Sequence, residues 1–463
     1  MNLTALATAI VLPWLLGAAW VRPLVTVPER GRPALVLGYG FLLGSVGFTV
    51  LMRAVDAVGL PLSFVNLALV GAAAVLLGLV LNLRAGQGAA GRGARADPGL
   101  GALPAWQKAL FVGLLALILA RLAGLALEVI WRPLFPWDAS MHWATKAKVW
   151  FDAAEIVPFV DYDRWLGSAE RVYTDPHPGY PITVPLLQVW VNSALGRWDD
   201  SLMNLPWVLC AAALGLAFFG QARQAGAGPL LSLAFVYFVL SMPMLNTQVA
   251  LAGYADLFMG ACYGAAVMAF YKWTRTRDRG DGILALAMAL CCPLIKNEGL
   301  FWAATLALGW LAAVLPPRKL AVVALAGIVV ALLALWLIPE DLRIAGNTLE
   351  GLGGLRFRAE AVVPILTSLF LFDSWHLLWY LVAALIPLGL VVLRPWRGAY
   401  LGIGVALGTA FVLFLTLFTF TGYAGTTAGF TSVSRITLHL APAFVFLAAL
   451  IAHDLTTRQG ERV

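Results

Sequence analysis

Long apolar runs, each about the length of a membrane-spanning helix, recur along almost the whole chain. A transmembrane helix needs about 20 predominantly apolar residues. Thirteen segments meet this requirement, at roughly 3–21, 34–52, 59–83, 108–130, 204–221, 229–245, 254–272, 282–296, 298–315, 320–338, 375–393, 398–420 and 435–453. Two shorter apolar segments, at about 181–196 and 361–372, have polar flanks. The pattern predicts an all-α polytopic membrane protein with about 13 transmembrane helices, in which the two shorter segments are interfacial or re-entrant.

The basic residues predict on which side each loop lies, because short cytoplasmic loops are enriched in Lys and Arg. We start with 22–33 on the cytoplasmic side. Counting forward then puts the other basic clusters on that side as well, at 84–107, 223, 272–279, 318–319, 394–397 and 458–462. This agreement requires 181–196 to enter and leave on one face. The sequence therefore predicts an external N-terminus, a cytoplasmic C-terminus and a large exocytoplasmic loop at 131–203.

Composition supports a membrane protein and argues against a soluble protein and a nucleic-acid-binding protein. Of 463 residues, 61% are hydrophobic and 12% are charged, against about 25% charged in soluble domains. The net charge of +7 comes mainly from topology-setting loops, so we expect no nucleic-acid partner. The four cysteines lie in apolar runs without zinc or redox spacing, and we expect them to be free: Cys210, Cys262, Cys291 and Cys292.

The Gly/Ala/Arg-rich stretch 84–107 predicts a flexible cytoplasmic linker. It divides the chain into three N-terminal transmembrane helices (1–83) and a transmembrane core (108–453), which a cytoplasmic tail (454–463) follows. No Walker A motif and no Rossmann fingerprint occurs. The sequence therefore disfavours a nucleotide-powered transporter.

The loop 131–203 contains an unusual density of ionisable and aromatic residues, beginning with FPWDASMHWATKAKVWFD. The prolines before Asp138 predict the start of a new amphipathic helix there, running to about residue 154 and lying along the membrane surface. Asp138, His142 and Lys146 are spaced i, i+4, i+8, which places them on one helix face. A carboxylate, an imidazole and an ammonium in a row suit a phosphorylated lipid. The alternative is that Asp138 only caps the helix and the other two form a solvated face.

Other polar residues punctuate the apolar runs on the same predicted side. His177 and Tyr180 lie in the rigid turn DPHPGYP, where His177 binds metal or substrate or is structural. Four more residues lie at helix ends: Tyr254, Asp256, Lys296 and Glu298, with Arg435 opening the last span. The alternatives are that Asp256 only caps its helix, that Lys296 and Glu298 form a self-neutralising pair at a helix break, and that Arg435 is an interface anchor. Because the topology puts them all on one side, we expect a common site.

These segments, taken in order, resemble the GT-C superfamily of integral-membrane glycosyltransferases, such as protein O-mannosyltransferases and bacterial aminoarabinose transferases. The resemblance rests on PWDASMHW, YPITVPLLQVWVNSALG, GYADLFMGA, LIKNEGLF and SRITLHLAP. It covers 108–453. It implies a GT-C-like core and a polyprenyl-phosphate-linked sugar donor. It also implies transfer, usually with inversion, to an envelope lipid, glycan or protein at the outer face of the bacterial cytoplasmic membrane.

The resemblance also implies residue roles. Asp138 corresponds to the family's catalytic base and Asp256 to its second acidic position. Binding of the donor phosphate or substrate falls to His142, Lys146, His177, Tyr180, Tyr254, Lys296, Glu298 and Arg435, and sugar stacking to Trp137 and Trp143. Asp138 is followed by Ala139 and Ser140 rather than by a second acid. The basis for a divalent metal is therefore weak, and we expect no cofactor.

Two other classes stay open. A transporter or flippase of an anionic lipid or solute would also use Lys, Glu and Arg in the membrane, but near the midplane and on interrupted helices in matching halves. A non-catalytic scaffold of envelope assembly would not depend on Asp138. The resemblance gives no role to the three N-terminal helices.

Overall fold

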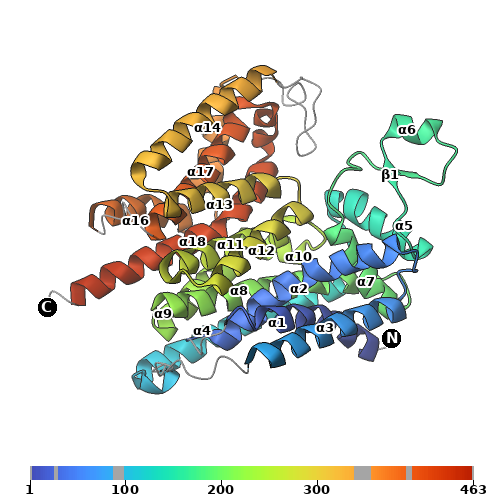
Figure 1. Ribbon diagram of the computed structural model, residues 1–463, viewed down its shortest axis with the longest axis horizontal. Helices are drawn as coiled ribbons and strands as arrows, with labels where there is room; N and C mark the ends of the chain where they lie inside the picture. The colour runs from blue at the N-terminus through green and yellow to red at the C-terminus, as the bar shows by residue number, and fades with distance from the viewer. Residues whose placement is uncertain (1–2, 26–29, 87–98, 338–355, 393–398, 461–463) are drawn as a thin grey trace.

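The computed structural model describes residues 3–25, 30–86, 99–337, 356–392 and 399–460, which are almost entirely helical (Figure 1). Within these ranges the strands are β1 (Phe159–Val160) and β2 (Tyr173–Thr174), which pair in parallel with Phe159 opposite Tyr173. The predicted all-α class is confirmed. By length and composition seven described helices can cross a membrane, or eight if a bent pair counts as one span. The total of thirteen stays a prediction.

The N-terminal helices are α1 (Leu3–Val21), α2 (Arg32–Ala57) and α3 (Phe64–Gly86). The first two touch backbone to backbone. A Cβ atom added to Gly17 would lie 1.8 Å from the Gly40 carbonyl oxygen, and one on Gly44 would lie 1.9 Å from that of Pro13. Small residues at a helix crossing allow this close approach within a membrane.

The chain continues through η1 (Leu100–Ala102) and α4 (Ala105–Trp131) into the large loop. The loop contains the π-helical segment η2 (Ala139–Ala144), then α5 (Thr145–Ala153), α6 (Tyr162–Gly167) and α7 (Thr183–Leu195). Helix α7 has 13 residues, of which all but Ser193 are buried. Its length of roughly 20 Å is shorter than a hydrocarbon core of about 30 Å. This length agrees with the prediction that 181–196 does not cross.

The remaining helices form the body of the molecule. Their bounds are η3 (Leu202–Asn204), α8 (Leu205–Ala225), α9 (Pro229–Ser241), α10 (Pro243–Ala250), α11 (Asp256–Thr276), α12 (Arg279–Ile295), α13 (Gly299–Val314), α14 (Pro317–Leu337), η4 (Ala359–Ala361), α15 (Val362–Leu366), the π-helical η5 (Thr367–Leu371), α16 (Leu378–Val392), α17 (Ala399–Phe420), η6 (Gly422–Gly429) and α18 (Thr431–Gly460). The predicted span at 229–245 is a pair, α9 and α10, bent by 58°. Pro243 accounts for the break, because proline removes a helix hydrogen bond.

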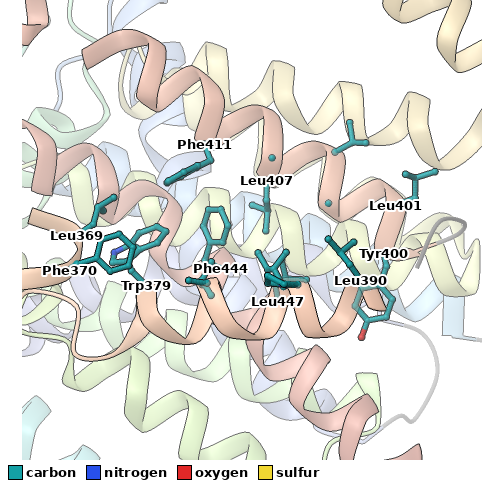
Figure 2. Close-up of a pocket in the computed structure, with 17 residues that line it drawn as sticks. Leu369, Phe370, Trp379, Leu390, Tyr400, Leu401, Leu407, Phe411, Phe444 and Leu447 are labelled. Atoms are coloured by element: carbon teal, nitrogen blue, oxygen red, sulfur yellow. The ribbon is translucent and has the colours of Figure 1, made fainter. Parts of the chain in front are cut away.

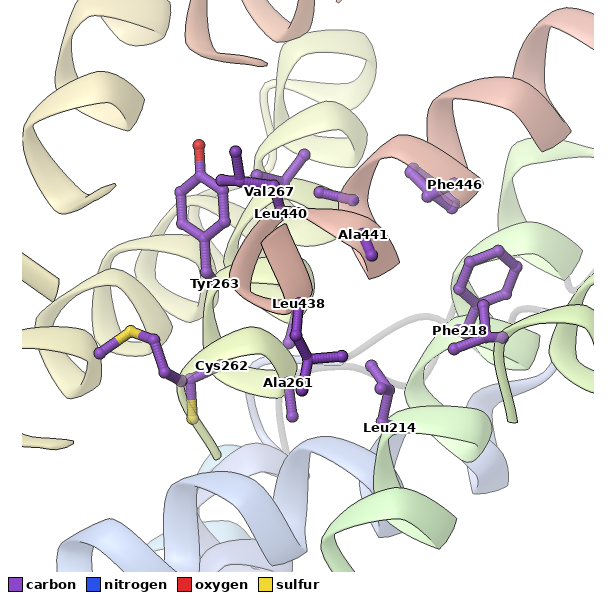
Figure 3. Close-up of a cluster of buried hydrophobic side chains, with 14 of the residues drawn as sticks. Leu214, Phe218, Ala261, Cys262, Tyr263, Val267, Leu438, Leu440, Ala441 and Phe446 are labelled. Atoms are coloured by element: carbon purple, nitrogen blue, oxygen red, sulfur yellow. The ribbon is translucent and has the colours of Figure 1, made fainter. Parts of the chain in front are cut away.

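Helices α8, α11 and α18 form the centre of the core (Figure 3). Phe218 of α8 packs edge-on against Phe446 of α18, with ring centroids 5.6 Å apart. Gly260 of α11 lets α18 approach closely, because a Cβ there would lie 2.6 Å from the Leu438 carbonyl oxygen. All four cysteines are buried and free, as predicted.

Helix α2 packs directly into this core, and α1 and α3 pack against α2. A Cβ on Gly38 of α2 would lie 2.4 Å from the Ala217 nitrogen of α8. The Tyr39 hydroxyl donates a hydrogen bond to the Ala265 carbonyl of α11 at 2.8 Å. The indole of Trp190 in α7 donates to the Ala9 carbonyl at 2.8 Å. The N-terminal helices therefore border both the core and the large loop.

The described basic loops gather at one end of the bundle. Gly31 lies against Arg223, Gly280 lies against the Leu24 carbonyl, and Arg277 donates to the Ala313 carbonyl at 2.7 Å. Figure 1 shows the N-terminus at the opposite end, beside α7, and the C-terminus away from it. For these loops the grouping matches the one predicted from charge, whereas 87–98 and 394–397 lie outside the described residues. That this basic end faces the cytoplasm stays a prediction.

Candidate active site

Asp256, the first residue of α11, is completely buried and has three donors around it. Its Oδ1 lies 2.8 Å from Lys296 Nζ and 2.9 Å from His439 Nε2, and its Oδ2 accepts Arg435 Nε at 2.9 Å. Arg435 and His439 are four residues apart on α18, so one helix face supplies both. Residues from α11, α18 and the α12–α13 connection thus meet on one carboxylate.

Arg435 joins this centre to the large loop. Its Nη1 hydrogen-bonds Oδ2 of Asp138, and its guanidinium carbon lies 4.3 Å from the centre of the Tyr254 ring. Planar guanidinium can hold two carboxylates in fixed orientations. The Asp138 backbone is itself helical, and its side chain makes no cap hydrogen bond. The alternative that Asp138 only caps a helix is therefore wrong, because its carboxylate binds Arg435.

Lys296 lies in the break between α12 and α13. Its Nζ is 3.2 Å from Glu298 Oε1 as well as 2.8 Å from Asp256. The break is tight, because a Cβ on Gly299 would lie 2.2 Å from the Cys292 carbonyl. The self-neutralising pair of Lys296 and Glu298 that the sequence suggests does exist, but Lys296 also donates a hydrogen bond to Asp256. Glu298 Oε2 is buried and has no hydrogen-bond partner among the described residues.

The hydrogen bonds fix His439 as a neutral side chain. Trp302 Nε1 donates to His439 Nδ1 at 3.1 Å, and an indole N–H is only a donor. His439 Nδ1 is therefore an acceptor, and Nε2 carries the hydrogen that points to Asp256. The cluster then holds three carboxylates, those of Asp138, Asp256 and Glu298, against the two cations Lys296 and Arg435. The cluster therefore has more negative than positive charges.

A second cluster surrounds the buried carboxylate of Asp175. Its Oδ1 lies 3.3 Å from His142 Nδ1, and its Oδ2 lies 3.5 Å from Lys146 Nζ. Lys146 also donates to the His177 carbonyl at 2.9 Å. Burial lowers the pKa of Lys146, and Asp175 partly offsets this effect. Lys146 is 1% exposed, so it does not belong to a solvated face.

The expected single face of Asp138, His142 and Lys146 is wrong. Asp138 binds Arg435, whereas His142 and Lys146 bind Asp175. The reason is the π-helical segment η2, which follows Asp138 and contains His142. A π-turn accommodates an extra residue per turn and so changes the direction of the side chains that follow it.

A three-ring stack connects the two clusters. Tyr180 lies between Trp143, at 5.3 Å and 14°, and His177, at 4.8 Å and 17°. Burial, followed by the charge of Glu298, raises the pKa of Tyr180 to about 12. Trp143 is 1% exposed, so its predicted contact with a sugar is wrong. Trp137 is 71% exposed, so its ring is accessible to solvent.

An apolar groove of about 600 Å³ lies between α16, α17 and α18 (Figure 2). Trp379, Phe411 and Phe444 line one part of it, and Leu390 and Tyr400 line another. At the end near Leu369, Ser368 Oγ and Ser434 Oγ are 3.1 Å apart. Ser434 directly precedes Arg435, whereas the α18 residues that line the groove itself, Phe444 and Leu447, lie further along the helix.

Two site residues were not singled out from the sequence: Asp175 as a central partner, and His439. The i, i+4 spacing from Arg435 could have indicated His439. Among the described residues no group of three His, Cys, Asp or Glu side chains could hold a metal ion. Searches of family models, curated proteins and solved structures found no match to this chain.

Proposed function

We propose that this chain transfers a sugar from a polyprenyl-phosphate donor to an envelope acceptor at the outer face of a bacterial cytoplasmic membrane. The observation that carries the proposal is the contact between Asp138 and Arg435. That contact joins the large loop to a buried charged cluster at the start of α11 and α18. Stability alone does not favour such a cluster, because buried ion pairs are weak contributors to it. Ionisable residues within a membrane more often mark a substrate site.

Asp138 is suited to accept a proton. Its Oδ2 is held by Arg435, its side chain is 32% exposed, and Oδ1 has no partner among the described residues. The acceptor hydroxyl attacks the anomeric carbon, and Asp138 Oδ1 takes the hydroxyl proton as the new C–O bond forms. The bond from the anomeric carbon to the phosphate oxygen breaks, and polyprenyl phosphate leaves with the electron pair. The donor ester is already activated, so the step needs no nucleotide.

Asp256 is a positioning residue under this proposal. Three donors occupy both of its oxygens, and solvent does not reach it. It cannot readily take a proton from an acceptor. Instead it fixes the orientation of Arg435 and Lys296, and preorganised cations stabilise charge that develops on a leaving group.

The groove between α16, α17 and α18 supports a donor with a hydrocarbon chain. Its lining is almost wholly apolar, and at its Leu369 end the neighbouring Ser368 contacts Ser434, the residue before Arg435. A lipid chain in the groove would hold its phosphate end near the charged cluster. The cluster lies where α11 and α18 start, rather than in the middle of either helix. This position favours transfer at a membrane face over the transporter alternative.

Mass spectrometry of envelope glycans, with and without this protein, tests the proposal. We expect loss of one sugar substituent when the gene is removed and its return with the wild-type protein. Purified protein with a polyprenyl-phosphate sugar and a membrane extract should give a covalent product. Movement of the donor between leaflets with no covalent product would favour the flippase instead.

A further inference from the structure

Arg53 lies near the end of α2 that faces the large loop. Its Nη2 donates to the Thr183 hydroxyl of α7 at 3.2 Å, and that hydroxyl donates to the Leu294 carbonyl of α12 at 2.6 Å. Thr49, one turn earlier on the same face of α2, is completely buried and lies 3.5 Å from Thr183. Arg53 therefore lies at the junction of three helices rather than on the lipid-facing side of α2.

Arg53 has no acidic partner among the described residues. Its Nε is buried without a hydrogen bond. Asp56, the nearest acid along the helix, instead accepts the Ile156 backbone N–H at 2.8 Å. The cations of the site differ, because Lys146, Lys296 and Arg435 each contact at least one carboxylate. A partly buried guanidinium without a counter-charge is costly unless an anion joins it.

The position of Arg53 connects it to the charged cluster. Leu294, which shares the Thr183 hydroxyl with Arg53, is two residues before Lys296. Thr183 is three residues after Tyr180, whose ring lies within the field of Lys296 and Glu298. The cluster around Asp256 has more carboxylates than cations, so a phosphate there needs another positive group. In the part of the chain that the structure describes, Arg53 is a cation at this junction that no carboxylate neutralises.

We propose that Arg53 binds the phosphate of the lipid-linked substrate and supplies the positive charge that the Asp256 cluster lacks. This inference rests on the proposed function. It also gives the N-terminal helices a role in the site, because α2 carries Arg53 while α1 and α2 hold α7 in place. Arginine suits phosphate, since its planar fork donates two parallel hydrogen bonds.

Ligand-dependent thermal stabilisation of the full chain in phosphatidylcholine nanodiscs tests the inference. The probes are undecaprenyl phosphate, undecaprenol, which lacks the phosphate, and phosphatidylglycerol, which offers a bulk lipid phosphate. The variants are Arg53→Gln and Arg53→Lys. Arg164→Gln is the matched control, because Arg164 is exposed on α6 and remote from the junction.

We expect undecaprenyl phosphate, but not undecaprenol, to stabilise the wild-type protein. Arg53→Gln should weaken this phosphate-dependent binding about tenfold or more. Arg53→Lys should bind at an intermediate level, because it keeps the charge and loses the fork. It also serves as the test variant if Arg53→Gln does not fold. Arg164→Gln should match the wild type.

Three results would overturn the inference. If Arg53→Gln (or Arg53→Lys, where the Gln variant does not fold) binds undecaprenyl phosphate as tightly as the wild type, Arg53 does not bind the phosphate. The proposed sugar transfer would not be affected by that result. Equal, Arg53-dependent stabilisation by phosphatidylglycerol makes Arg53 a lipid-headgroup anchor. If undecaprenol stabilises the protein as much as undecaprenyl phosphate does, the protein does not recognise the phosphate at all. Phosphate-dependent binding without sugar transfer would instead contradict the proposed function alone.

Discussion

Arg435 hydrogen-bonds Asp138 although 297 positions separate the two residues. The same guanidinium also binds Asp256, so it connects a partly exposed carboxylate to a fully buried one. Neither contact is local in sequence: the first depends on the packing of the large loop against α18, and the second on the packing of α11 against α18. Substitutions at the two carboxylates should therefore have different effects, one on activity and the other mainly on folding.

We expect Asp138→Asn to fold normally and to lose activity about 10²–10⁴-fold, as is typical of general-base loss. Asparagine keeps the size of the side chain and one oxygen for Arg435, but it cannot take the acceptor proton. Sugar transfer by purified protein in nanodiscs measures the effect. Asp138→Ala removes the Arg435 contact as well and should be at least as impaired.

Asp152→Asn is the matched control for Asp138→Asn. Asp152 is exposed and its only ion pair is a 3.9 Å contact with Lys148 among the described residues. Its replacement should leave turnover unchanged. Normal turnover of Asp138→Asn at normal expression would rule out Asp138 as the base. The buried, fully occupied oxygens of Asp256 would not offer a ready substitute.

Asp256→Asn should destabilise the protein strongly. It removes the carboxylate that faces Lys296 and Arg435, and breaking a buried ion pair typically costs about 3–5 kcal/mol. The expected readout is a lower midpoint of thermal unfolding and a lower yield in detergent. Asp163→Asn on the exposed surface of α6 is the control. Equal midpoints for Asp256→Asn and the wild type would contradict a central structural role.

The helical class and the main polar segments could be predicted from sequence for a physical reason. A backbone in lipid must satisfy its own hydrogen bonds, so long apolar runs become helices. Ionisable residues at the ends of such runs are costly, and topology restricts the side on which they lie. Asp256, Lys296 and Arg435 were identified in this way, and the structure brings them together.

The pairing of these residues could not be predicted, because it depends on details that periodicity does not encode. The π-helical segment after Asp138 turns His142 and Lys146 toward Asp175. Likewise, the sequence does not distinguish Arg53 from an ordinary helix-end residue, and only the structure shows that no carboxylate among the described residues pairs with it. The groove between α16, α17 and α18 arises from packing alone and has no sequence signal.

His177 predicts a pH dependence of stability. Burial, followed by the electrostatic effect of the neighbouring His142, lowers the pKa of His177 below its usual 6.5. As pH falls through that usual value, the unfolded chain takes up a proton before the folded chain does, so stability falls. We expect the thermal midpoint to drop between about pH 7.5 and about pH 5.5, and to drop less in His177→Gln. Identical changes in the two proteins would contradict this role for His177.

Cysteine labelling tests the predicted topology. The native cysteines are buried, so single cysteines introduced at exposed positions should give the main signal. Asp163 lies in the large loop and Arg279 lies at the basic end of the bundle, and both are exposed. We expect Asp163→Cys to react with an impermeant maleimide in intact cells and Arg279→Cys to react only after permeabilisation. Reaction of both from the same side would contradict the assignment of 131–203 to the exterior.

The apolar groove predicts a dependence on lipid chain length. Gly404 and Gly408 of α17 both line the groove, and a Cβ atom added at either would have no heavy atom within 4 Å. Gly408→Leu should therefore fold and place its side chain in the groove. We expect a several-fold higher KM for a long-chain polyprenyl-phosphate sugar and little change for a short-chain donor, because about 0.8 kcal/mol is lost for each CH₂ group excluded from apolar contact.

Gly113→Leu on α4 is the matched control, since its position is equally open but outside the groove. An unchanged KM for the long donor would show that the lipid chain binds elsewhere. An equal rise in KM for both donors would indicate a general distortion of α17.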